Sequence, residues 1–150
     1  MPEASLAVEG EGLRAFNLLT GSARALAFGS GRGDTLTMLE AALGKAATEQ
    51  GENIDCGARF ARWDNGLSVW FSKDRFVGWS LGESGATLTT ASGIGIGSTR
   101  SELDSAYSAS IAPSSLGTEF SAGGLAGLLD SAKPQARITN LWAGATCIAR

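Results

Sequence analysis

Hydrophobic and polar positions alternate along several short stretches of the chain, which is the pattern of half-buried β-strands. The clearest stretch is Leu67–Ser72, where Leu, Val and Phe at odd positions alternate with Ser, Trp and Ser at even positions. We predict two hairpins, over 67–79 and 116–128, that turn at 72–75 and 121–124. Further strands are predicted over 5–8, 13–17, 23–28, 58–63, 87–90 and 136–142.

Apolar residues recur at helical spacing in two short segments, 36–43 and 103–107. Thr99 followed by Glu102 has the spacing of a capping box, in which each residue satisfies a free N–H of the other. Asp34 and Thr35 are placed to cap the first helix with a side-chain oxygen, without the reciprocal glutamate. Two short helices are therefore predicted, each needing support from the rest of the fold.

The predicted elements occur twice in the same order, so we interpret the chain as a tandem duplication. Segment 29–43 aligns with 93–107, and 67–79 aligns with 116–128. Between helix and hairpin the second copy is shorter by 15 residues, which predicts an insert around Cys56 in the first copy. The alternative is two unrelated turn–helix pieces in a glycine-rich chain.

This order predicts an α+β fold in one module, residues 1–150, with helices on one face of an antiparallel sheet. Two tandem helix-plus-antiparallel-hairpin units, approximately 23–81 and 87–148, share that sheet, and a separate hairpin covers 5–17. Function is expected where the copies differ, because features that occur in both are those that the fold needs twice.

Composition narrows the function classes. The net charge of −3, with no run of basic residues, argues against nucleic-acid binding, which needs clustered Lys and Arg. No stretch approaches the roughly 20 apolar residues of a membrane-spanning helix. The chain has 0 histidines, so the commonest general base and metal ligand is missing, and we predict no cofactor, no metal and no catalytic residue.

In the Gly-x-Gly-x-Gly segments 29–33 and 93–97, the glycines would let the backbone approach a phosphate at a helix N-terminus. Their spacing differs from the dinucleotide fingerprint, since Asp34 and Ser98 stand where its last glycine belongs, and no Gly-Lys-Ser/Thr follows. We interpret both segments as tight turns into a helix.

Cys56 and Cys147 have three possible states: a disulfide, buried free thiols, or a nucleophile. A nucleophilic thiol needs a base partner, and no histidine is present to supply one. A disulfide is favoured if the protein is exported, because disulfides persist in oxidising compartments. Since Met1 and the residues after it do not form a signal peptide, export would require a leader removed ahead of residue 1.

Tryptophans are the most suggestive candidates for a binding surface. Trp70 alternates with the apolar set of its strand, so it is expected on the open face of the sheet, as an exposed aromatic. Trp63 and Trp142 are further candidates, together with Arg59 in the predicted insert.

Gly97–Leu103 and Gly33–Leu39 each have the pattern Gly, a capping residue, Thr and a short helix that ends on Leu. This pattern resembles the unit shared by β-lactamase inhibitor proteins and the small outer-membrane assembly lipoproteins of the SmpA/OmlA type. The tandem arrangement is more similar to the inhibitor proteins, which present a concave sheet. The resemblance implies an extracytoplasmic setting, periplasmic or secreted, and a disulfide inside each unit, whereas this chain has one cysteine per half.

We predict a non-catalytic, extracytoplasmic binding module whose partner is another protein. The module would bind this partner through an open sheet face, as an inhibitor protein binds its target. Two alternatives remain: an envelope-assembly or structural component, and a hydrolase that uses paired carboxylates. A hydrolase would need two acids converging within about 10 Å.

Overall fold

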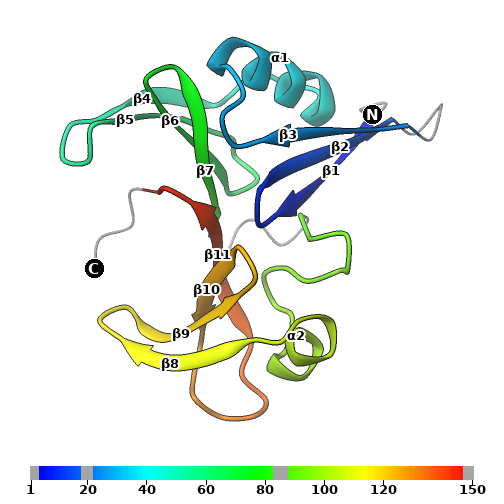
Figure 1. Ribbon diagram of the computed structural model, residues 1–150, viewed down its shortest axis with the longest axis vertical. Coiled ribbons are helices and arrows are strands. Elements are labelled where there is room, and N and C mark those ends of the chain that lie inside the picture. Colours follow the sequence, from blue (N-terminus) through cyan, green and yellow to red (C-terminus); the bar gives the residue numbers. More distant parts are fainter. Residues whose placement is uncertain (1–3, 18–21, 83–87, 147–150) are drawn as a thin grey trace.

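A computed structural model describes residues 4–17, 22–82 and 88–146. The fold is mixed α+β and contains two antiparallel sheets, one of three strands in the order β1-β2-β3 and one of eight in the order β4-β5-β6-β7-β11-β10-β9-β8 (Figure 1). The elements are β1 Ala4–Glu9, β2 Gly12–Asn17, β3 Ala23–Ala27, α1 Arg32–Leu43, β4 Glu49–Asn53, β5 Ala58–Arg62, β6 Leu67–Ser72, β7 Arg75–Leu81, α2 Arg100–Ala106, β8 Ser110–Ser114, β9 Gly117–Ala122, β10 Leu125–Leu129 and β11 Ile138–Gly144.

The large sheet consists of two meanders that meet at their last strands. Strands β4 to β7 follow α1 and lie in chain order, and β8 to β11 follow α2 and lie in the reverse order. Antiparallel pairing of β7 with β11 joins the two halves, with Ser80 opposite Trp142 and Leu81 opposite Leu141. We call this β7–β11 contact the seam.

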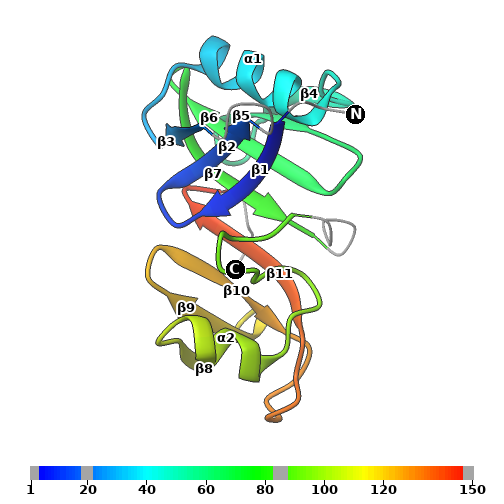
Figure 2. The ribbon, with the colours of Figure 1, turned by 90° about the vertical axis from the view of Figure 1, so that its right-hand side faces the viewer.

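Both helices and the small sheet cover the same face of the large sheet. Figures 1 and 2 show α1, α2 and β1–β3 all on that side. Leu39 from α1 and Leu103 from α2 are fully buried in one core with Val69 of β6 and Leu141 of β11. Burial of such apolar side chains is the main source of stability for these short helices.

The small sheet contacts both halves of the large one. Trp79 of β7 donates its indole N–H to the Glu9 carbonyl oxygen at 2.9 Å. At the other half, the β1–β2 turn meets the β9–β10 turn so closely that a Cβ on Gly10 would lie 2.9 Å from the Cα of Gly124. The small sheet therefore spans the two halves on the helix side.

The two helix entries make matching contacts with the last strand of their own half. Each entry exchanges two backbone hydrogen bonds with a residue near the start of that strand, through Gly29, Ser30 and Phe76 in the first half and Gly97, Ser98 and Ile138 in the second. Arg75 donates to the Gly29 carbonyl at 3.4 Å, and Arg137 donates to the Gly97 carbonyl at 2.8 Å. The glycine turns thus use their backbone groups to hold a helix against a strand.

The capping box of α2 is confirmed, since Thr99 and Glu102 bond each other's backbone N–H groups. The predicted cap of α1 is wrong. Its N-cap is Gly31, which has no capping side chain, while Thr35 is buried and donates its hydroxyl to the Gly31 carbonyl at 2.8 Å. A backbone entry held by strand β7 replaces the side-chain cap.

The predicted hairpins over 67–79 and 116–128 are confirmed as β6–β7 and β9–β10. They do not occupy equivalent places, because β6–β7 reaches the seam and β9–β10 stops one strand short of it. The predicted 15-residue insert is therefore wrong, since each helix is followed by an outer strand, β4 or β8, that the alternation does not reveal. Strand β3 joins the predicted hairpin 5–17 rather than the first unit, and residues 88–90 form only isolated bridges.

Candidate binding face of the large sheet

The face of the large sheet that points away from the helices is called the open face here. In the described ranges, no helix or second sheet lies on it (Figures 1 and 2). Register pairs place one row of side chains along this face, from β5 through the seam to β9. The row consists of Arg62, Ser68, Ser80, Trp142, Ala126 and Ser121.

Trp70 lies on the open face, in the row next to the one that contains Ser68 and Ser80. It is buried in spite of this position, with 7% of its surface exposed, so the prediction of an exposed aromatic is wrong. The Phe60 ring packs against it at 5.7 Å between centroids, and its indole N–H reaches the Ser80 Oγ at 3.5 Å. Neighbours on the same face cover the ring from its sides, which fixes its orientation.

Trp142 lies in the seam and is only 6% exposed. In the part of the chain that the structure describes, its indole N–H makes no hydrogen bond, whereas those of Trp63, Trp70 and Trp79 all do. No buried polar atom there is left unsatisfied, so this N–H keeps contact with solvent. It is therefore a donor available to a ligand.

A hollow of about 360 Å³ opens beside Trp142. Its polar side chains are Arg62, Ser68, Ser80 and Asn140, and Leu128 adds an apolar wall. Residues from β5, β6 and β7 meet residues from β10 and β11 here, so the hollow exists only where the two halves join. Among the described residues, no acidic side chain lines it, so they give the carboxylate hydrolase no support at this place.

Arg62 borders the hollow at its outer end. Its guanidinium lies over the Phe60 ring, 5.0 Å from the centroid, and its Nε donates to the Ser68 Oγ at 3.3 Å. An ion pair with Glu49 on β4 is long, at 3.5 Å, and both side chains are about half exposed. Such a pair contributes little to stability, so Arg62 keeps donor capacity toward the hollow.

The chain after β11 turns onto the open face next to Trp70. Gly144 adopts a left-handed φ of 73°, and the N–H of Ala145 then donates to the Val77 carbonyl at 2.8 Å. A Cβ on Gly78, the register partner of both Trp70 and Gly144, would lie 2.0 Å from the Ala145 carbonyl oxygen. Only glycine at position 78 leaves room for this path.

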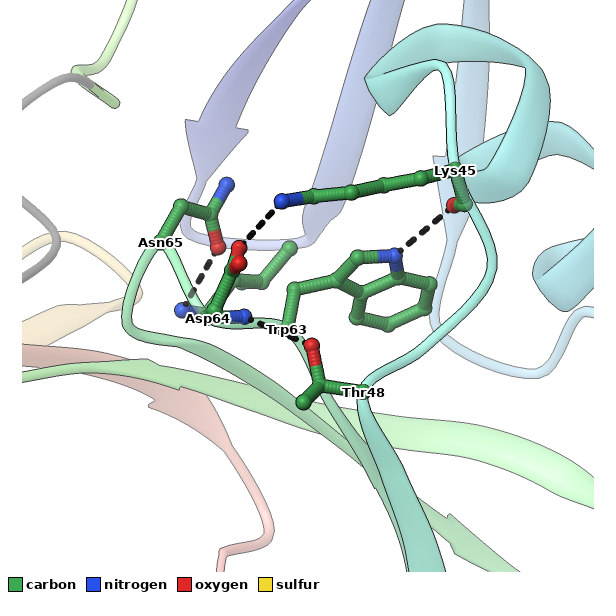
Figure 3. A network of polar contacts seen from close by, with 6 residues as sticks. Lys45, Thr48, Trp63, Asp64 and Asn65 are labelled. Carbon is green, nitrogen blue, oxygen red and sulfur yellow. Dashed lines mark hydrogen bonds and ion pairs between the residues drawn. The ribbon is translucent and has the colours of Figure 1, made fainter.

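Trp63, a predicted binding residue, lies on the helix side and not with Trp70 and Trp142. It is 1% exposed, and its indole N–H donates to the Lys45 carbonyl at 3.1 Å (Figure 3). Asp64 next to it pairs with the Lys45 side chain, and its backbone N–H donates to the Thr48 Oγ1 at 3.1 Å. This network anchors the chain after α1, so Trp63 is left out of the candidate face.

Arg59 is exposed but also points to the helix side, because its register partner is the buried Phe71. It borders a separate hollow of about 320 Å³ with Arg32, at the outer edge of the sheet. Arg32 pairs with Asp74 at 3.2 Å. The structure thus brings together Trp70 and Trp142 of the four predicted binding residues.

The β4–β5 turn carries Cys56 and a highly exposed Ile54, 89% accessible to solvent. Cys147 lies outside the described residues, so the pairing of the two cysteines stays a prediction. In the described part of the chain, no group of acidic or cysteine side chains could hold a metal ion. Within the same residues, no helix is both long and apolar enough to cross a membrane.

Sequence reasoning missed Phe60, Arg62, Ser80 and Asn140 as members of this face. The alternation within 58–63 places Phe60 and Arg62 on the same side as each other, so part of the signal was present. Ser80 and Asn140 carry no such signal, because their position depends on which strands meet at the seam.

Comparisons with protein-family models, with curated proteins and with solved structures found no match for this chain. The candidate face is accordingly defined by its geometry alone.

Proposed function

We propose that this protein is a non-catalytic binding module that holds another protein against the open face of its large sheet. The observation that carries the proposal is the position of three aromatic side chains, Phe60, Trp70 and Trp142, on the open face, over which no described helix or strand lies. Hydroxyl and amide groups surround them, including Ser68 and Asn140.

Such a surface suits protein recognition for energetic reasons. Aromatic side chains that are already fixed by their neighbours lose little freedom when a partner binds. Trp70 is held by Phe60 and Ser80 before any contact is made. Polar groups around the aromatic centre then provide direction to the contact.

Inhibitor-like binding is part of this proposal, together with a tandem origin of the two halves. Matching helix entries and the symmetric order of strands around the seam support the duplication. An inhibitor role rests on the likeness of this arrangement to the inhibitor proteins, which is an argument by analogy. We further propose an extracytoplasmic location, for which the predicted Cys56–Cys147 disulfide is the support.

A blocking substitution tests the face directly. Ala126→Arg adds a long charged side chain beside Trp142, the register partner of Ala126. Ser121→Arg adds the same side chain at an exposed position one strand farther from the seam. Ser101→Arg is the matched control, because it adds the same group to an exposed position of α2 on the opposite side.

Immobilised wild-type protein and the three variants would be used to recover partners from an envelope extract of the source organism. We expect a protein that wild type and Ser101→Arg retain and that both face variants lose at least about tenfold, a difference of about 1.4 kcal/mol. Urea unfolding establishes that all variants are folded. Equal retention by wild type and the face variants would contradict the proposal.

A further inference from the structure

We infer that the hollow at the seam takes a carboxylate side chain, an aspartate or glutamate of the partner protein; this inference rests on the proposed function. The starting point is the indole N–H of Trp142, which is the side chain's only polar group. Trp142 is more than nine-tenths buried and lines the hollow, and its N–H has no hydrogen-bond partner in the described residues.

The other polar groups of the hollow are also donors. Ser80 Oγ accepts the Trp70 indole N–H, and Ser68 Oγ accepts the Arg62 Nε–H, so each serine hydroxyl still has its hydrogen to give. Asn140 Oδ1 accepts from the Thr139 hydroxyl at 2.9 Å, which leaves the amide NH₂ of Asn140 to donate. The residues that line the hollow thus carry four kinds of donor group: indole N–H, hydroxyl, amide NH₂ and guanidinium.

An ionised carboxylate is the side-chain group that matches this set, because it accepts hydrogen bonds and donates none. A carboxamide would lack the negative charge that Arg62 favours at the border of the hollow. Among the described residues, no acidic side chain lines the hollow. Glu49, the register partner of Arg62 on β4, pairs with it at 3.5 Å, and both side chains are about half exposed, so water and salt screen this pair.

Geometry sets the reach of the site. Arg62, Ser68, Ser80 and Trp142 are successive register partners on four neighbouring strands. Neighbouring strands are about 4.8 Å apart, so the row is roughly 14 Å long, and a single carboxylate covers only its seam end. Ser80 is the register partner of both Ser68 and Trp142, so the donor groups of the seam end belong to neighbouring strands.

The test uses ¹⁵N-labelled protein and two isosteric peptides, N-acetyl-Gly-Glu-Gly-amide and N-acetyl-Gly-Gln-Gly-amide, at constant ionic strength. The indole N–H signal of Trp142 is assigned by its loss in Trp142→Phe. We expect the Glu peptide to move this signal downfield with a Kd in the millimolar range, at least about fivefold tighter than the Gln peptide. The Trp63 indole, bonded to Lys45, is the internal control and stays in place.

Removing the donors should remove the preference. Ser68→Ala combined with Ser80→Ala is expected to weaken binding of the Glu peptide about fivefold, and Arg62→Gln to bring the two peptides closer in affinity. An unmoved Trp142 signal, or equal binding of Glu and Gln peptides, would overturn the inference. If face variants still lose a protein partner while the Glu peptide has no effect, this inference fails and the proposed function stands. If the face variants retain every partner while the Glu peptide still binds selectively, the proposed function fails, the assignment to a partner protein fails with it, and only the affinity of the hollow for a carboxylate stands.

Discussion

Replacing Gly78 with alanine should destabilise the protein by displacing the chain after β11. The added Cβ would lie 2.0 Å from the oxygen, 2.7 Å from the carbon and 3.0 Å from the nitrogen of Ala145. All three are backbone atoms, so no flexible side chain can move aside. The backbone at Gly78 does not have a left-handed φ, and alanine is therefore strained by contact alone.

The magnitude follows from what must move. Shifting Ala145 breaks its 2.8 Å hydrogen bond to the Val77 carbonyl, at a cost of about 1 kcal/mol. Overpacking against the fixed seam adds about 2 kcal/mol. We therefore expect Gly78→Ala to lower the free energy of unfolding by about 3 kcal/mol, and the amide of Ala145 to lose protection from hydrogen exchange.

Gly82→Ala is the matched control, because a Cβ there meets no atom within 4 Å and the residue has no left-handed φ. This variant should remain within about 0.5 kcal/mol of wild type or gain slightly, since alanine restricts the unfolded chain. Both variants are compared by urea unfolding monitored through tryptophan fluorescence. A Gly78→Ala protein as stable as the Gly82→Ala protein would show that Ala145 does not lie over residue 78.

Four further predictions concern other parts of the molecule. Trp70→Ala should cost about 3 kcal/mol in urea unfolding, since the ring is 7% exposed, and a loss under 1 kcal/mol would mean that its neighbours do not cover it. Thr99→Ala should cost about 1 kcal/mol through the lost cap. The backbone N–H and the hydroxyl of Thr99 lower the pKa of Glu102 below 4.5. The extra stability of wild type over Glu102→Ala should therefore be complete above pH 4.5 and should disappear as the pH falls through the lowered pKa. A difference in stability that persists in acid would contradict this. For Cys56 and Cys147, reduction should add two hydrogens to the intact mass of protein purified without reductant, and an unchanged mass would remove the support for export.

The strands that sequence reasoning predicted are those that face the core, because burial on one side imposes alternation. Strand β4 reads Glu-Gln-Gly-Glu-Asn, with four of five residues exposed, and β8 contains Pro113. Both are edge strands, where charge and proline protect against pairing with other chains and erase the hydrophobic pattern. Because these two strands were not predicted, the two hairpins were aligned with each other incorrectly. The resulting difference in spacing was interpreted as an insert.

The candidate face was predictable only in part, for a related reason. Alternation identified the side of the sheet on which Trp70 lies. The exposure of Trp70 depends on which strands lie beside its own, and alternation does not give the order of the strands in the sheet. Phe60 covers Trp70 through the pairing of β5 with β6, and Ser80 meets Trp142 through the seam. As tryptophans, Trp63 and Trp142 were equally good candidates for the binding face. Trp63, however, lies one residue beyond β5 and points into the core.

The seam also orders the folding of the chain. Most strand pairs are hairpins between neighbours in sequence, which close quickly because little chain entropy is lost. Pairing of β7 with β11 joins segments at the ends of the two meanders and must wait until β11 has been synthesised. The hollow at Trp142 takes its lining from both halves, so it cannot form while β11 is still missing from the nascent chain.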